Sequence, residues 1–509
     1  MAAPMKNSVK LVIYTLACLA AVPFASLAEA QSEADRLIEE ALKPSPVEQN
    51  LRHLTDEIGG RVPGTPALDR AVAWGVAAFE AAGADKVHTE EFTLPASWAE
   101  GATEVHISSI GTATDAKLSS LPPVEFKVRA VSIAWAPALS AKHVPVVDVG
   151  AGTESDLKKV GDISGKLVLV HSNVLKTWAD LFDEYMKAPA VIEASVKGKA
   201  KAIAFIATRE HDVLYRHINT MTGEIDRIPM LLVAREDGER VGRLLASGHP
   251  VWADLSIPNK IGGPVKASNV IAEIKGSEKP EEFVVLGAHL DSWELGTGAL
   301  DNGCNAALVV DALRTIKASE LKPRRSIRFV LFTGEEQGML GSRAYATAHR
   351  SELDNAAGVA VIDAGIGRVT GFTLGGRKDI ADALGGITKP LAQFNANVLT
   401  TDDVEWGTDN FDFLLEGVPT LVANQEEGNY LVNYHATSDT FDKVDIPQLK
   451  KHTAVMTVVA FGIANAPERI GPRFTRGQIE KELRDTHADE QMKPLGIWAE
   501  WESGKRGRQ

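Results

Sequence analysis

The chain has 509 residues, more than one hydrophobic core usually serves, so at least two domains are expected. Its apolar fraction of 44% and charged fraction of 24% are typical of a globular protein. A formal net charge of -14 excludes a general attraction for nucleic acids or anionic membranes and favours solubility.

Residues 1–30 have the pattern of a signal peptide. Lys6 and Lys10 form a basic start, the run 11–27 is mostly apolar, and residues 28–30 (AEA) make a small-x-small cleavage site. A retained membrane anchor is the alternative, but the apolar run is interrupted and short for a membrane span. We therefore expect an exported protein, periplasmic or secreted, that is not inserted in a membrane after the signal is cleaved.

The two cysteines of the chain restrict its chemistry. Cys18 lies inside the predicted signal. Lipid attachment there is an alternative to simple cleavage, although Thr15 stands where a lipoprotein signal has a large aliphatic residue. After cleavage only Cys304 remains, so we expect neither an internal disulfide nor a cysteine metal site in the mature chain.

Residues 31–109 are predicted to form the first part of the main domain. Apolar residues spaced by three and four predict a helix over 66–83, which Gly83 ends. A strand is expected to follow over 86–93.

Residues 110–262 differ in sequence pattern from the neighbouring segments and are predicted to be an inserted β-rich domain. Short β-rich runs alternate here with turns and one helix near 188–200. The marking runs are 150–154 (GAGTE), 163–170 (ISGKLVLV), 200–205 (AKAIAF) and 228–233 (IPMLLV). Their order resembles the protease-associated domain that is inserted in several exopeptidases. An unrelated β-rich insertion is the alternative.

Residues 263–465 alternate between strand and helix patterns, which predicts a mostly parallel sheet with helices on both faces. The expected strands are 283–286, 326–333, 358–363 and 418–423, and the expected helices are 305–318, 341–349, 379–394 and 446–464. Residues 466–509 form a charged tail that is expected to wrap the surface or a partner.

Residue types that bind metals follow the strands of this predicted sheet. The set is His289, Asp291, Asp301, Glu335, Glu336, Asp363 and His435. Taken singly, a histidine after a strand is usually only hydrogen-bonded, and paired glutamates are usually solvated or cap the next helix. In open α/β sheets, however, the carboxyl ends of the strands meet at one edge, so we expect these side chains to converge.

Convergence of so many acids is electrostatically unfavourable unless one or two divalent cations balance them. Imidazole and carboxylate ligands without a thiolate are typical of zinc in a catalytic site. With two metals, a shared carboxylate holds the ions about 3.5–4 Å apart and a water can bridge them. The adjacent Glu335 and Glu336 can then have different roles, one as a metal ligand and the other as a general base.

Several motifs in the segment 263–465 support a resemblance to a known family. They are 287–293 (GAHLDSW), 298–303 (GALDNG), 332–338 (FTGEEQG), 407–409 (GTD) and 435–440 (HATSDT). These motifs resemble those of the co-catalytic zinc exopeptidases, which include bacterial leucine aminopeptidases and glutamate carboxypeptidases. The resemblance is closest to the carboxypeptidase Q branch and covers about 48–465.

The resemblance implies a zinc-exopeptidase fold of the phosphorylase/hydrolase type, in which a mostly parallel mixed sheet is flanked by helices. The peptidase domain then comprises 31–109 and 263–465, interrupted by the protease-associated-like insertion. The resemblance also implies two zinc ions per chain and, as in many relatives, a homodimer.

The resemblance also implies a role for each residue of the set. Asp301 bridges both zinc ions; His289 and Asp363 complete one, and Glu336 and His435 the other. Glu335 activates the metal-bridging water as general base, and Asp291 orients the imidazole of His289. A cis peptide is implied between Asp301 and Asn302, where Asn302 departs from the Asp-Asp pair of many relatives.

We therefore predict an exported metallo-exopeptidase, an aminopeptidase or dipeptidase that acts on peptides or dipeptides. A carboxypeptidase or another amidohydrolase on the same scaffold is the alternative, and it needs a positive pocket, for which Arg377 and Lys378 are candidates. A binding protein that has lost its metals is disfavoured because every ligand position is filled. The insertion is predicted to govern substrate access or partner contact without supplying catalytic groups.

Overall fold

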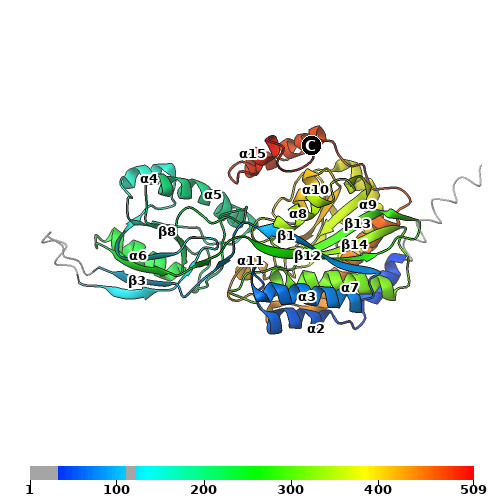
Figure 1. Cartoon of the computed structure of the whole chain (residues 1–509), viewed down its shortest axis with the longest axis horizontal. Helices are drawn as coiled ribbons and strands as arrows, with labels where there is room; N and C mark the ends of the chain where they lie inside the picture. The colour runs from blue at the N-terminus through cyan, green and yellow to red at the C-terminus, as the bar shows by residue number, and fades with distance from the viewer. Residues whose placement is uncertain (1–32, 110–121) are drawn as a thin grey trace, which may run out of the picture.

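The computed structural model describes residues 33–109 and 122–509 (Figure 1). The predicted signal peptide lies outside the described residues, as does the segment 110–121 at the start of the predicted insertion. Among the described residues, no helix combines the length and apolar character that a membrane span requires.

The larger half is built on a mixed eight-stranded sheet in the order β1-β12-β14-β13-β15-β18-β16-β17. Its strands are β1 (Lys86–Leu94), β12 (Val265–Ile274), β13 (Lys279–His289), β14 (Arg325–Phe332), β15 (Ala356–Val361), β16 (Val369–Thr373), β17 (Val398–Thr400) and β18 (Thr420–Gln425). The central strands β14, β13, β15 and β18 run parallel. Antiparallel pairs, β1 with β12 and β12 with β14, extend one side of the sheet. The predicted α/β class with a mostly parallel mixed sheet is confirmed.

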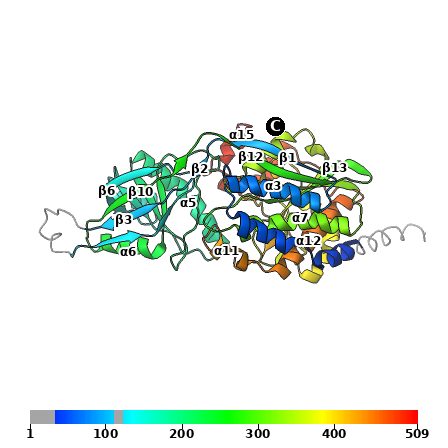
Figure 2. The ribbon, with the colours of Figure 1, turned by 60° about the horizontal axis from the view of Figure 1, so that its bottom comes forward.

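The central strands are mainly apolar in their middle parts, where both of their faces are covered. In β13, Val284 and Leu286 enter the core beneath α3 (Pro66–Ala81), α7 (Cys304–Ala318) and α12 (Ile446–Asn465). The alternating residues Phe283 and Val285 enter a second core with α8 (Leu340–Ala348) and α10 (Phe411–Leu415). Figures 1 and 2 show α3 and α7 side by side along one face of this sheet.

The smaller half is a second eight-stranded sheet in the order β4-β3-β10-β6-β7-β8-β9-β5. Its strands are β3 (Glu104–Ser108), β4 (Glu125–Val128), β5 (Ala130–Ser132), β6 (Leu139–Asp148), β7 (Leu167–Val170), β8 (Ala202–Ile206), β9 (Met230–Val233) and β10 (Trp252–Ile257). Strands β6 to β9 run parallel. Helix α4 (Glu154–Val160) connects β6 to β7, α5 (Trp178–Lys197) connects β7 to β8, and α6 (Arg235–Ala246) lies between β9 and β10. This sheet lies beside the larger half in both views (Figures 1 and 2). The boundaries 110 and 262 themselves stay a prediction.

Helix α5 begins ten residues before the helix predicted near 188–200, at Trp178. Thr177 and Asp180 form a reciprocal capping box that satisfies free N–H groups of the first turn. Pro189, a residue that favours helix starts, lies inside the helix. Because of this earlier start, the first half of α5 faces the cavity at the predicted ligands.

The C-terminal tail packs on the larger half through α13 (Arg476–Asp485), α14 (Ala488–Met492) and α15 (Ile497–Glu502). Apolar residues of these helices, among them Trp498 and Trp501, join a core with Trp406 and Phe411. The buried guanidinium of Arg506 donates two hydrogen bonds, of 2.8 and 2.6 Å, to the carboxylate of Asp412 in α10. The tail thus lies on the chain's own surface, as α15 shows in Figure 1.

We expect Leu286→Ala to destabilise the larger half, because this side chain is fully buried at the centre of β13. Truncating a buried leucine removes apolar contacts and leaves a cavity, which lowers the free energy of unfolding by about 2–5 kcal/mol. The midpoint of urea unfolding measures the change. Val398→Ala, at a valine that is 60% exposed, is the control and should shift the midpoint little. Equal shifts for both variants would contradict this description of the core.

Candidate metal centre and active site

The predicted ligands converge at the carboxyl edge of the larger sheet. His289 is the last residue of β13, Glu335 and Glu336 follow β14, and Asp363 follows β15. Asp301 lies in the segment Ala299–Gly303 (η3) that leads into α7, and His435 follows the short helix Tyr430–Asn433 (α11). Because β13, β14 and β15 are parallel neighbours, their ends place these side chains at one edge.

Asp301 lies between the two imidazoles and turns a different oxygen to each. Its Oδ1 is 3.2 Å from Nε2 of His289, and its Oδ2 is 3.3 Å from Nε2 of His435. The same nitrogen of His289 is 3.0 Å from Oδ1 of Asp363, and that of His435 is 2.9 Å from Oε2 of Glu336. The side chains therefore form two groups, His289 with Asp363 and His435 with Glu336, that share one carboxylate.

The donor atoms of these groups fit divalent cations. Ligand atoms of His289, Asp301 and Glu336 lie within 4.8 Å of one another, as do those of His289, Glu335 and Asp363. Oδ2 of Asp301 and Oε1 of Glu336 are buried and have no hydrogen-bond partner among the described residues. Buried acceptors without donors are costly unless a cation takes the place of the donor. Nitrogen and oxygen ligands without a thiolate suit zinc.

The pKa values in the protein alone reflect this crowding of acids. Burial raises the pKa of Glu336 to about 7, although the charge of His435 opposes the rise. Burial acts to lower the pKa of His435, but the carboxylates of Glu336 and Asp301 prevail and raise it to about 9. Burial also raises the pKa of Glu335 well above its usual range. The site therefore holds positive charge strongly, as bound protons or as metal ions.

Glu335 and Glu336 differ in their relation to the imidazoles. Oε2 of Glu335 is 4.0 Å from Nε2 of His289, farther than the oxygens of Asp301 and Asp363. Glu336 instead contacts His435 directly and is almost completely buried. Glu335 is thus placed beside one group and Glu336 within the other.

Asp291 is fully buried behind the ligands and does not line the pocket. Its carboxylate accepts hydrogen bonds of 3.3 Å from the backbone N–H groups of both Glu335 and Glu336. Nδ1 of His289 donates to the backbone carbonyl of Asp291 at 3.0 Å, whereas the carboxylate oxygen of Asp291 is 3.8 Å from that nitrogen. Burial raises the pKa of this carboxyl to about 6. Asp291 therefore supports the turn that carries the two glutamates and orients His289 through its carbonyl.

Two residues of the motifs 407–409 (GTD) and 435–440 (HATSDT) support the predicted ligands, although no pattern in the sequence indicates these roles. The carboxylate of Asp439 accepts hydrogen bonds from the backbone N–H groups of Ala299, Leu300 and Asp301, at 3.0, 2.6 and 3.2 Å. The hydroxyl of Thr408 donates to Oδ2 of Asp363 at 2.6 Å. The implied cis peptide between Asp301 and Asn302 is present.

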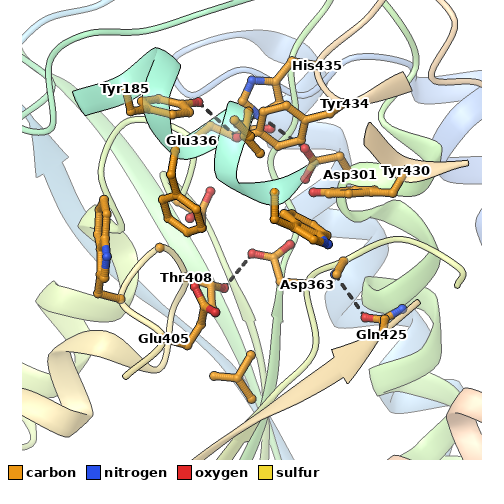
Figure 3. Close-up of a pocket in the computed structure, with 18 of the residues that line it drawn as sticks. Tyr185, Asp301, Glu336, Asp363, Glu405, Thr408, Gln425, Tyr430, Tyr434 and His435 are labelled. Carbon is orange, nitrogen blue, oxygen red and sulfur yellow. Dashed lines mark hydrogen bonds and ion pairs between the residues drawn. The ribbon is translucent and has the colours of Figure 1, made fainter. Parts of the chain in front are cut away.

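A cavity of about 430 Å³ opens onto the ligands (Figure 3). Its walls come from α5 of the smaller half, from the loop around Trp406, and from Leu495 of the tail. Aromatic rings dominate these walls: Trp178, Phe182, Tyr185, Trp406, Tyr430 and Tyr434. Acids and amides also line the cavity, with Glu405 and Gln425 labelled in Figure 3. No lysine or arginine is among the described residues that line it.

The cationic candidates Arg377 and Lys378 do not line this cavity. The guanidinium of Arg377 is buried, donates two hydrogen bonds of 2.7 Å to Asp379, and donates another to the carbonyl of Pro472. It also stacks on the ring of Phe474 at 3.5 Å. These contacts join the larger half to the start of the tail.

Comparison with known proteins agrees with this geometry. Residues 269–460 match the model of peptidase family M28. This match indicates a metallopeptidase. Carboxypeptidase Q from Mus musculus is 26% identical over 426 residues, 83% of this chain and 86% of the relative. Carboxypeptidase Q from Homo sapiens is 26% identical over 424 residues, with the same coverage.

Solved structures of the M28 type share the fold. A peptidase M28 precursor from Shewanella amazonensis is 25% identical, with a TM-score of 0.77 over 88% of this chain and 100% of that chain. BSAP, a zinc aminopeptidase from Bacillus subtilis, is 18% identical, with a TM-score of 0.63 over 84% and 97%. The resemblance to zinc exopeptidases and to carboxypeptidase Q is confirmed, and the M28 family implies peptide substrates.

We expect the purified protein to bind two zinc ions and to lose hydrolytic activity when a chelator removes them. Binding to the folded state alone should also raise the midpoint of thermal unfolding. Elemental analysis, peptide hydrolysis and thermal unfolding of the chelated and zinc-restored protein measure these effects. Full hydrolysis by protein that contains no zinc would contradict the metal assignment.

Proposed function

We propose that the chain is an exported two-zinc exopeptidase that releases the amino-terminal residue of short peptides or splits dipeptides. The observation that carries this proposal is the carboxylate of Asp301, shared by two imidazoles beside a cavity whose lining, among the described residues, contains no lysine or arginine. The pattern of residues 1–30 supports export to the periplasm or beyond.

In this proposal His289, Asp363 and Asp301 hold one zinc ion, and His435, Glu336 and Asp301 hold the other. Zinc bound at such a pair acts as a Lewis acid and lowers the pKa of water. Each imidazole has its second nitrogen occupied by a backbone carbonyl, which fixes the tautomer that offers Nε2 to a metal.

Glu335 is proposed as the general base that accepts the proton of the attacking water and returns it to the leaving amine. Its carboxylate lines the cavity beside the ligands. The side chain is only 12% exposed and is therefore shielded from bulk water. Its raised pKa, caused by burial, makes the carboxylate a stronger base and favours acceptance of the proton from water.

The charge of the cavity walls favours recognition of a free amino terminus. Asp403, Glu405 and Glu335 line the cavity without a neighbouring lysine or arginine in the lining, so an ammonium group of the substrate would meet compensating charge. A carboxypeptidase is the second candidate, favoured by the name of the carboxypeptidase Q relatives. It would need a cation for the substrate carboxylate, and Arg377 is engaged elsewhere.

We expect N-acetylation of a tripeptide to lower kcat/KM by roughly 10–100-fold, because it removes a charge-assisted contact worth about 1.5–3 kcal/mol. Amidation of the carboxyl end should have a much smaller effect. The assay compares the free, N-acetylated and C-amidated forms of the same tripeptide. The opposite order of sensitivity would favour the carboxypeptidase candidate.

The two adjacent glutamates should respond differently to the same substitution. Glu335→Gln should keep both zinc ions and the fold but lower turnover by about 10²–10⁴-fold, the usual contribution of a general base. Glu336→Gln removes a charged ligand and should lower the zinc content as well as the rate. Zinc per chain and turnover are measured for both variants. Loss of zinc from Glu335→Gln with two ions retained by Glu336→Gln would reverse the two roles.

A further inference from the structure

A segment of the smaller half runs beside His435 and makes backbone hydrogen bonds with it. The N–H of Arg216 donates to the carbonyl of His435 at 2.8 Å, and the N–H of Thr437 donates to the carbonyl of Leu214 at 3.1 Å. Between them, Tyr215 and Ala436 form an antiparallel bridge. The residues around His435 are thus paired with a segment more than 200 positions earlier in the chain.

The two imidazoles of the site are oriented from different halves of the molecule. Nδ1 of His289 donates to the carbonyl of Asp291, two residues away in the same loop, at 3.0 Å. Nδ1 of His435 donates to the carbonyl of Arg216 at the same distance of 3.0 Å. Both imidazoles donate to a backbone carbonyl, but only the carbonyl that accepts from His435 belongs to the smaller half.

The side chain of Arg216 fixes that carbonyl in place. Its guanidinium is completely buried, lies 2.6 Å from Glu100 and 2.5 Å from Glu294, and also donates to the carbonyl of Ser132. Glu294 belongs to the loop after β13 in the larger half. A charge-assisted hydrogen bond therefore joins the two halves next to the carbonyl that orients His435.

The ring of Tyr434 adds a second support from the same side. It stacks on the imidazole of His435 with ring centres 3.6 Å apart. Its hydroxyl lies 3.0 Å from the hydroxyl of Tyr185 in α5, and its carbonyl accepts from Arg209 at 3.2 Å. Figure 3 shows Tyr185 and Tyr434 facing each other beside His435.

We infer that the smaller half positions His435, so that zinc affinity of the His435–Glu336 group depends on contact between the two halves. The His289–Asp363 group, oriented within the larger half, does not depend on it. Arg216 and Glu294 are the positioning residues of this contact. The inference rests on the proposed two-zinc function and adds that the smaller half controls one of the two metal positions.

The test is a zinc titration of the metal-free full-length protein against a competing chelator, for wild type, Arg216→Lys and Glu294→Gln. Glu294→Gln weakens the contact without altering the interior of the smaller half, because Glu294 is 35% exposed and lies outside that half. Outer partners of metal ligands typically contribute 10–100-fold to metal affinity. We expect a loss in this range for one zinc and an unchanged affinity for the other.

Matched controls are available far from the site. Arg325→Lys alters an equally buried arginine paired with Glu282, and Glu352→Gln alters a 38% exposed glutamate paired with Arg328. Both should keep both zinc affinities. Glu336→Gln identifies the affected position, because it should weaken the same binding step as Glu294→Gln.

Folding of each variant is checked by circular dichroism and gel filtration. A folded Glu294→Gln that binds both ions as tightly as wild type would overturn the inference, while a two-zinc, active wild type would keep the proposed function. Equal weakening of both steps would also overturn it, since only one position is argued to depend on the contact. A wild-type protein that binds no zinc would instead remove the proposed function and the inference together.

Discussion

The carboxylate of Asp301, shared between two buried imidazoles, is the contact on which the arrangement of the site depends. Its oxygens lie 3.2 and 3.3 Å from His289 and His435, and these imidazoles in turn contact Asp363 and Glu336. Carboxylates held this close in a low-dielectric interior repel one another strongly unless positive charge lies between them. The sheet edge therefore suits bound cations, and the surrounding fold holds the acids in place against that repulsion.

Backbone groups provide most of that support. Asp439 accepts three N–H groups around Asp301, and Asp291 accepts those of Glu335 and Glu336, so each functional turn is held by a buried carboxylate. The parallel register of β13 with β14 and β15 then sets the spacing between the turns. Charge-assisted bonds of this kind are about twice as strong as neutral ones, which suits a site that must stay rigid before substrate binds.

The sequence alone was sufficient for the elements and residue types whose signals are local. Apolar runs predict the central strands, and the acids and histidines that follow these strands meet at one edge of the sheet. Helix α5 begins ten residues earlier than predicted, after the capping box of Thr177 and Asp180. The partners Arg216 and Glu294 could not be predicted, because no periodicity or motif links residues that meet only when two sheets pack together. The same holds for Leu495 of the tail, which lines the cavity from the far end of the chain.

The two halves of the molecule contribute different parts of the site, which affects how substrate specificity and catalytic chemistry can vary. The first part of α5 and the loop around Trp406 supply walls of the cavity, and their rings contact each other, with Phe182 and Trp406 5.8 Å apart. These walls contact the predicted ligands through the tyrosine pair and through Thr408, which donates to Asp363. Changes in Phe182 or Trp406 are expected to alter the shape offered to a substrate and to leave the ligands in place. The segment that contains Arg216 is different, since its carbonyl orients His435. Under the proposed function, the smaller half therefore contributes one surface, the first part of α5, to the substrate cavity and another, the segment with Arg216, to the support of His435.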